Sequence, residues 1–155
     1  MDVEFHLDDG FVGAHRVVLV TASRIFLECF KNNQDRYKFE LDKYCTKTVE
    51  SAINFIYTSK LDNECCTVEL IEFAHEFKIK SLIAHLDEIS SRFITSKNAL
   101  DFYIAAEKIG LVNLMDHCFQ LMYKNKIDLK EIISTGGYDS NINDKEIIKL
   151  LLKFL

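Results

Sequence analysis

The fold is decided by residues 2–19, which read DVEFHLDDGFVGAHRVVL. At the start of this stretch Val3, Phe5 and Leu7 alternate with polar side chains, which is the pattern of a half-buried β-strand. A second apolar run, residues 11–13, follows an Asp-Gly pair. Such a pair between two strand patterns is a strong hairpin signal, because glycine tolerates positive φ. The stretch therefore predicts a β-hairpin.

Beyond the hairpin the sequence carries helical patterns and one further strand. Alternation over residues 37–41 predicts that short strand, and apolar residues at helical spacing predict the helices. The expected helices lie at residues 24–31, 47–57, 68–77, 79–93, 99–109, 111–123, 128–133 and 145–155. Ser23, Ser81 and Asp144 are the expected N-caps, and Gly110 is expected to end a helix. The sequence thus predicts an α+β fold, in which a small sheet is followed by an all-α extension.

The overall composition favours an ordinary globular protein, since 48% of the 155 residues are hydrophobic and 28% are charged. No apolar run approaches the roughly 20 residues of a membrane-spanning helix, so we expect no membrane contact. The net charge is −5 and no cluster of lysine and arginine is visible, which argues against direct binding to nucleic acid. The acidic first residues do not fit a secretory signal. We therefore expect a cytoplasmic protein, with the nucleus as a second location.

Cysteine and histidine residues give no sign of a catalytic site. The five cysteines are odd in number and scattered, and we expect reduced thiols. Cys65 and Cys66 are adjacent and have no further ligands at metal-site spacing. No histidine stands in a metal-binding motif, and the glycine pair at 136–137 lacks a phosphate-binding framework. The sequence predicts a protein that is not an enzyme and has no cofactor and no metal.

Two motifs at a fixed distance carry a resemblance to a known family. Ala14-His15-Arg16 follows the hairpin, and Phe55-Ile56-Tyr57-Thr58 ends the helix after the third strand. This combination resembles the BTB/POZ family from residue 2 to about residue 93, and we place a BTB/POZ domain at residues 1–94. The resemblance implies the BTB/POZ fold, in which a small β-sheet is flanked by a cluster of helices.

A second resemblance begins just after this segment. Residues 96–111, SKNALDFYIAAEKIGL, resemble the 3-box that opens the BACK domain of kelch-like BTB proteins, and residues 127–155 resemble the next BACK helices. We therefore place a 3-box and the N-terminal part of a BACK domain at residues 95–155. Kelch repeats do not follow, so we expect a short gene or the N-terminal part of a longer protein. The lysine, isoleucine and asparagine content is typical of an AT-rich genome and fits the poxviral members of this family.

The resemblance implies a protein-protein interaction adaptor. Kelch-like BTB proteins bind the N-terminal domain of cullin-3, which brings a ubiquitin ligase to substrates, and cullin-3 is therefore the first expected partner. The partner-binding residues that the resemblance implies are Asn33, Gln34, Asp35, Tyr44 and Thr46. Tyr44 and Thr46, which precede and open the third main helix, are expected to be surface contacts.

Two departures from the family pattern keep a second function open. The loop NNQDR, residues 32–36, lacks the hydrophobic-x-acidic motif of cullin-3 adaptors. The sequence also starts at the first common strand, without the helix and swapped strand of the usual BTB dimer. The alternative is a BTB assembly or decoy module with no ligase role, which pairs with other BTB chains, as a homodimer or heterodimer, or with transcriptional co-repressors.

Asp2 and Arg16 match the charged pocket through which BTB repressors recruit partners. The other interpretation is a half-buried ion pair that fixes the fold.

In the helical extension, the side chains of Phe102, Tyr103 and Leu111 are expected to lie in the core of a helix pair.

His15 and Tyr57 belong to the two motifs that carry the family resemblance. His15 is expected to form hydrogen bonds inside the fold, and Tyr57 is expected to lie in the core.

Overall fold

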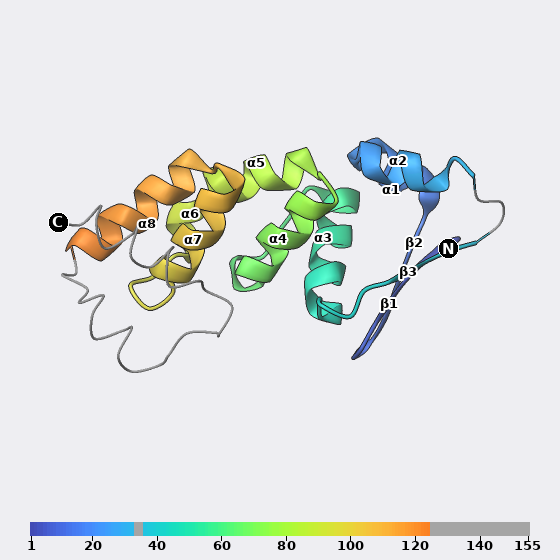
Figure 1. Ribbon diagram of the computed structural model, residues 1–155, viewed down its shortest axis with the longest axis horizontal. Helices are drawn as coiled ribbons and strands as arrows, with labels where there is room; N and C mark the ends of the chain where they lie inside the picture. The colour runs from blue at the N-terminus through green and yellow to red at the C-terminus, as the bar shows by residue number, and fades with distance from the viewer. Residues whose placement is uncertain (33–35, 125–155) are drawn as a thin grey trace.

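The computed structural model of the chain describes residues 1–32 and 36–124, which form an elongated molecule (Figure 1). The strands lie at one end, and the last described helix, α8 (Val112–Lys124), lies at the other. The predicted helices at 128–133 and 145–155 lie outside the described residues, as do loop residues 33–35.

A three-stranded sheet forms one end of the molecule. Its strands are β1 (Val3–Leu7), β2 (Gly10–Ala14) and β3 (Tyr37–Glu40), in the order β2-β1-β3. β1 and β2 are antiparallel, with Leu7 opposite Gly10, and β3 runs parallel to β1. The predicted hairpin and third strand are confirmed. Because Gly10 is already paired in the ladder, the two turn residues are Asp8 and Asp9.

Two short helices, α1 (Arg16–Ala22) and α2 (Arg24–Phe30), follow the hairpin and are separated only by Ser23. The Ser23 hydroxyl oxygen accepts a hydrogen bond from the backbone N–H of Ile25 at 3.0 Å, which confirms Ser23 as the N-cap of α2. The same hydroxyl donates to the carbonyl oxygen of Phe77. Ser23 therefore ties the α1–α2 corner to a distant part of the domain.

The middle of the molecule is helical. Its elements are α3 (Thr46–Thr58), the 3₁₀ turn η1 (Asn63–Cys65), α4 (Val68–Glu76), α5 (Lys80–Glu88) and α6 (Ser90–Phe93). One helix was expected over residues 79–93, but the backbone leaves the helical region at Ile89, which has φ −88° and ψ 8°, and this ends α5. Ser81 lies inside α5, whose N-cap is Ile79, so the prediction of Ser81 as a cap is wrong.

Phenylalanine rings from the sheet and from the helices form the centre of the core. Phe5 on β1 is completely buried and stacks on Phe39 of β3, with ring centroids 4.9 Å apart. Phe26 of α2 stacks on Phe77 at 5.1 Å, and Phe73 of α4 meets the edge of Phe5 at 6.4 Å. Aromatic pairs in these geometries add to the free energy of burial. One cluster therefore holds the sheet, α2 and α4 together.

The helical extension consists of α7 (Ala99–Ile109) and α8, which pack against each other and against α4, α5 and α6. Gly110 ends α7 in the left-handed region at φ 81°, as predicted, where a side chain would be strained. Phe102, Tyr103 and Leu111 are buried, which confirms their core positions. The observed architecture is the predicted α+β arrangement, with a helical extension on the side of α4 and α5 away from the sheet (Figure 1).

Candidate partner-binding surfaces

The start of α3 carries two of the predicted partner contacts, and we call residues Tyr44, Cys45 and Thr46 the α3 entry segment. The backbone N–H of Thr46 donates to the two carboxylate oxygens of Asp9 at 2.9 and 3.1 Å, and its hydroxyl donates to Asp9 Oδ1 at 2.6 Å. Asp9 lies in the β1–β2 turn, so it caps α3 from another element. The hydrogen bonds from Thr46 hold the pKa of Asp9 below its ordinary value. Thr46 itself is half-buried.

A second carboxylate fixes the middle of the α3 entry segment. The backbone N–H of Cys45 donates to Glu69 Oε1 of α4 at 2.5 Å. The side chains that surround the segment are exposed and charged: Asp42, Lys43, Lys47 and Glu50. The surface here is therefore polar, and its backbone is held in place from two sides.

Tyr44 does not lie at the surface, so the prediction of an exposed contact at this position is wrong. Its side chain is only 3% exposed. The ring packs edge-on against Phe73 at 5.1 Å, and the hydroxyl donates to Glu76 of α4. Burial and the neighbouring Glu76 carboxylate raise the pKa of Tyr44 well above its usual range. Tyr44 thus anchors the α3 entry segment from inside.

The remaining predicted partner contacts, Asn33, Gln34 and Asp35, lie outside the described residues. The described chain ends at Asn32 on one side of this loop and resumes at Arg36, directly before β3. Their role in binding stays a prediction.

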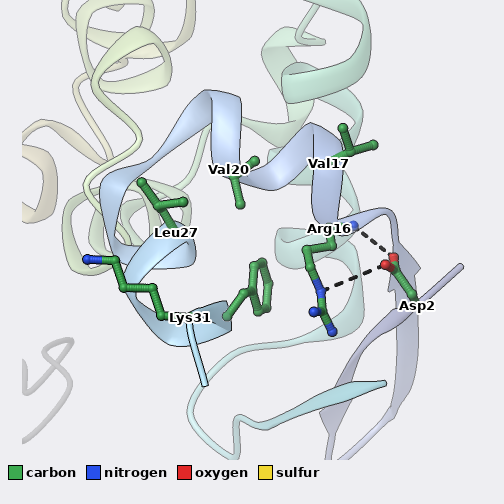
Figure 2. Close-up of a pocket in the computed structure, with 7 residues that line it drawn as sticks. Asp2, Arg16, Val17, Val20, Leu27 and Lys31 are labelled. Carbon is green, nitrogen blue, oxygen red and sulfur yellow. Dashed lines mark hydrogen bonds and ion pairs between the residues drawn. The ribbon is translucent and has the colours of Figure 1, made fainter. Parts of the chain in front are cut away.

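Asp2 and Arg16 meet, as predicted, at a cavity of about 360 Å³ that we call the α1–α2 pocket (Figure 2). The residues that line it are Asp2, Arg16, Val17, Val20, Leu27, Phe30 and Lys31. The backbone N–H of Arg16 donates to Asp2 Oδ1 at 2.8 Å, and the Arg16 Nε lies 3.8 Å from Asp2 Oδ2. The hydrogen bond from the Arg16 backbone lowers the pKa of Asp2. The guanidinium carbon lies 5.1 Å from the Phe30 ring centre, within cation–π distance.

Both interpretations of Asp2 and Arg16 agree with this geometry. The two residues form an ion pair whose arginine is mostly covered, and the pair also forms one wall of an open pocket. The sequence reasoning missed the apolar part of the rim, where Val17 is 71% and Leu27 is 45% exposed. A helical wheel for residues 16–22 could have found Val17, because Val17 and the buried Leu19 lie about 200° apart around a helix.

His15 and Tyr57 bond to each other near the surface. The Tyr57 hydroxyl accepts from the His15 backbone N–H at 2.9 Å and lies 2.7 Å from His15 Nδ1. The predicted hydrogen bonding of His15 within the fold is therefore found, although His15 itself is exposed. Tyr57 is 44% exposed, so the core position predicted for Tyr57 is wrong. Tyr57 lies near the end of α3, and its hydroxyl bonds to His15, 42 residues earlier in the chain.

The thiols and carboxylates of the described residues form no metal site, since no three His, Cys, Asp or Glu side chains converge there. All five cysteines are free thiols. Burial raises the pKa of Cys66 to about 11 and that of Cys118 to about 12, so both stay protonated near neutral pH and react poorly as nucleophiles. Among the helices in residues 1–32 and 36–124, none has the length and apolar character needed to span a membrane.

Similarity to known proteins identifies the family of this chain. The model of the BTB/POZ domain matches residues 1–94. The chain belongs to the BTB/POZ domain family. The BTB domain of zebrafish PATZ1 is similar in structure, with a TM-score of 0.50 and 26% identity over 59% of this chain and 75% of that one. The predicted family and fold are confirmed, and the BTB domain gives the chain a protein-interaction module.

Curated relatives of this BTB chain include several poxviral proteins. Kelch repeat and BTB domain-containing protein 1 of cowpox virus (strain GRI-90 / Grishak) is 27% identical over 97% of this chain and 27% of its own length. The camelpox virus (strain CMS) protein of the same name is 28% identical over 83% of this chain and 23% of its own length. Mouse Rabankyrin-5 is 21% identical over 84% of this chain and 11% of its own length.

The chain thus spans about a quarter of the length of the poxviral relatives that it matches. The alignment with the cowpox protein nevertheless covers nearly the whole chain, and so runs past residue 94 into the helical extension. These relatives support an adaptor role in protein interaction. The assignment of residues 95–155 to a 3-box and part of a BACK domain stays a prediction.

Proposed function

We propose that this BTB chain recruits the N-terminal domain of cullin-3 and so joins a ubiquitin ligase to substrates. The observation that carries the proposal is the continuity between the BTB domain and the helical extension. α7 and α8 pack directly on α4, α5 and α6, and the cowpox kelch-repeat and BTB relative aligns along 97% of the chain. A partner can therefore contact both parts at once.

The surface that we assign to cullin-3 includes the exposed side of the α3 entry segment. Thr46 is half-buried there, and the exposed Lys47 lies next to it on α3. Asp9 and Glu69 hold the backbone in place, so little conformational entropy is lost there on binding. Tyr44 contributes by holding the segment from inside. Asn33, Gln34 and Asp35 remain proposed contacts of the same partner.

Calorimetric titration of the chain with purified cullin-3 N-terminal domain tests this proposal. We expect a dissociation constant near or below about 1 μM, which corresponds to about −8 kcal/mol. Lys47→Glu should weaken binding, whereas Lys60→Glu, a matched charge reversal beyond the other end of α3, should leave it unchanged. No heat at tens of micromolar protein would contradict the ligase role.

The α1–α2 pocket favours a second candidate function, in which the chain pairs with another BTB chain or with a co-repressor. The specific observation is the exposure of Val17 and Leu27 beside the Asp2–Arg16 pair. Exposed apolar side chains beside an arginine resemble the centre of a protein interface, where apolar area is buried and arginine is enriched. In this reading the chain acts as an assembly or decoy module.

Light scattering separates this second candidate from a monomeric adaptor. A BTB pair would show twice the 18.0 kDa mass of one chain, and Val17→Asp should return the mass to one chain. Val112→Asp makes the same change at an exposed position on α8 and is the control. A monomer at all concentrations would contradict self-pairing, and co-repressor binding would then be tested by titration.

Both candidate functions, the cullin-3 adaptor and the assembly or decoy module, consist of binding other proteins. We propose that the chain has no catalytic centre and no cofactor of its own, binds neither nucleic acid nor membrane directly, and acts in the cytoplasm, with the nucleus as a second location.

A further inference from the structure

The N-terminus of α8 is capped by a residue from a different helix. α8 follows Leu111, whose apolar side chain cannot accept a hydrogen bond from the first turn. The backbone N–H of Leu114 donates instead to Asp87 Oδ1 at 2.8 Å. The side-chain amide of Asn113 donates to Asp87 Oδ2 at 3.0 Å. Both carboxylate oxygens of Asp87, on α5, therefore serve the first turn of α8.

This cap joins the BTB/POZ domain to the helical extension that follows it. Asp87 belongs to the segment that matches the BTB/POZ domain, and α8 lies in the extension beyond it. Much of the remaining contact is apolar; Phe93 and Phe102, for example, pack with their ring centroids 5.3 Å apart. Apolar contact is non-directional, whereas a hydrogen bond fixes both distance and angle. Asp87 therefore defines the orientation of α8 in a way that apolar packing does not.

We propose that Asp87 is a positioning residue for partner binding, which sets the helix pair α7–α8 on the BTB domain so that both present one continuous surface. This inference rests on the proposed function, because it assumes a partner that contacts both parts. Without the carboxylate, the helix pair samples other orientations, and only a fraction of the molecules is ready to bind. The apparent dissociation constant then rises in inverse proportion to that fraction.

The test compares Asp87→Ala and Asp87→Asn with Glu88→Ala in the full chain. Glu88 is the exposed neighbour on α5, so its replacement removes the same charge without removing the cap. Hydrogen exchange of residues 112–116 reports the cap, and titration with the cullin-3 N-terminal domain reports the positioning. We expect Asp87→Ala to speed exchange of these amides about fivefold, as loss of an N-cap does, and to raise the dissociation constant about threefold or more.

Asp87→Asn shows whether the effect of Asp87→Ala comes from loss of the cap or from misfolding of the variant. Asp87→Asn keeps one acceptor oxygen for the Leu114 N–H, so it should fold and show a smaller change in both readouts. Faster exchange with an unchanged dissociation constant would reduce Asp87 to a stabilising cap and overturn the inference. Unchanged exchange would overturn it as well. Failure of the unaltered chain to bind cullin-3 would contradict the proposed function itself, and the positioning role with it.

Discussion

The α3 entry segment and the α1–α2 pocket are built in opposite ways. Asp9 of the β1–β2 turn and Glu69 and Glu76 of α4 hold the α3 entry segment, and the exposed groups around it are charged. The α1–α2 pocket is open and has an exposed apolar rim. Charged, pre-positioned groups favour specificity and fast association, whereas apolar rims provide buried area. The comparison indicates that one small domain can serve two kinds of partner.

The largest effect is expected from a substitution in the core that supports both the α3 entry segment and the α1–α2 pocket. Phe5 contacts the rings of Phe26, Phe39, Phe73 and Phe77, so Phe5→Ala opens a cavity beneath both surfaces. We expect a loss of about 3–5 kcal/mol in the free energy of unfolding, measured by urea denaturation.

Phe11→Ala is the control for this change. Phe11 is 68% exposed on β2, and its replacement should change the free energy of unfolding by less than about 0.5 kcal/mol. Similar losses for both variants would contradict the central place of Phe5 in the core.

A smaller effect is expected from a substitution that changes the α3 entry segment and leaves the α1–α2 pocket unchanged. Tyr44→Phe removes the hydroxyl that donates to Glu76 and leaves the ring in place, so only the α3 entry segment should loosen. We expect a loss of about 1 kcal/mol in the free energy of unfolding. Tyr123→Phe, at a side chain that is 74% exposed on α8, is the matched control and should have no effect. Equal stability of both variants would mean that the Tyr44 hydroxyl contributes nothing to the fold.

The smallest effect depends on pH. Hydrogen bonds from Thr46 lower the pKa of Asp9 below its ordinary value of 3.8. Its carboxylate therefore stabilises the fold above that value, and the contribution is lost as the pH falls through the lower pKa of the folded state. The difference in urea midpoint between the unaltered chain and Asp9→Asn should stay constant from about pH 7 to pH 5 and shrink below about pH 4.

Asp8→Asn is the control for this pH dependence, because it removes the same charge from the same turn but not the acceptor for Thr46. A midpoint difference for Asp9→Asn that persists at pH 2 would show that the carboxylate charge is not what holds α3.

Local signals in the sequence were enough for the hairpin, for the Ser23 cap and for the end of α7 at Gly110, because each depends on neighbours within a few residues. Tyr44 was misplaced because Glu76, its partner, is 32 residues away in the chain. Tyr57 was misplaced because helical spacing counts tyrosine as apolar, whereas its hydroxyl bonds to His15.

The residues that cap α3 and α8 could not be predicted from the sequence either, because each lies far from its helix along the chain. Asp9 lies 37 residues before Thr46, and Asp87 lies 27 residues before Leu114, so neither pair has the short spacing of a capping motif. The family resemblance identified Asp2 and Arg16 as neighbours, and the structure adds the apolar rim around them.

The most direct test of the central claim is the mass of the species that forms when the full chain is mixed with the cullin-3 N-terminal domain. Size-exclusion chromatography with light scattering measures it without assuming a binding surface. The account predicts a complex whose mass contains at least one 18.0 kDa chain together with the cullin domain at micromolar concentrations. Two separate peaks at their individual masses, at concentrations of tens of micromolar, would contradict the adaptor role.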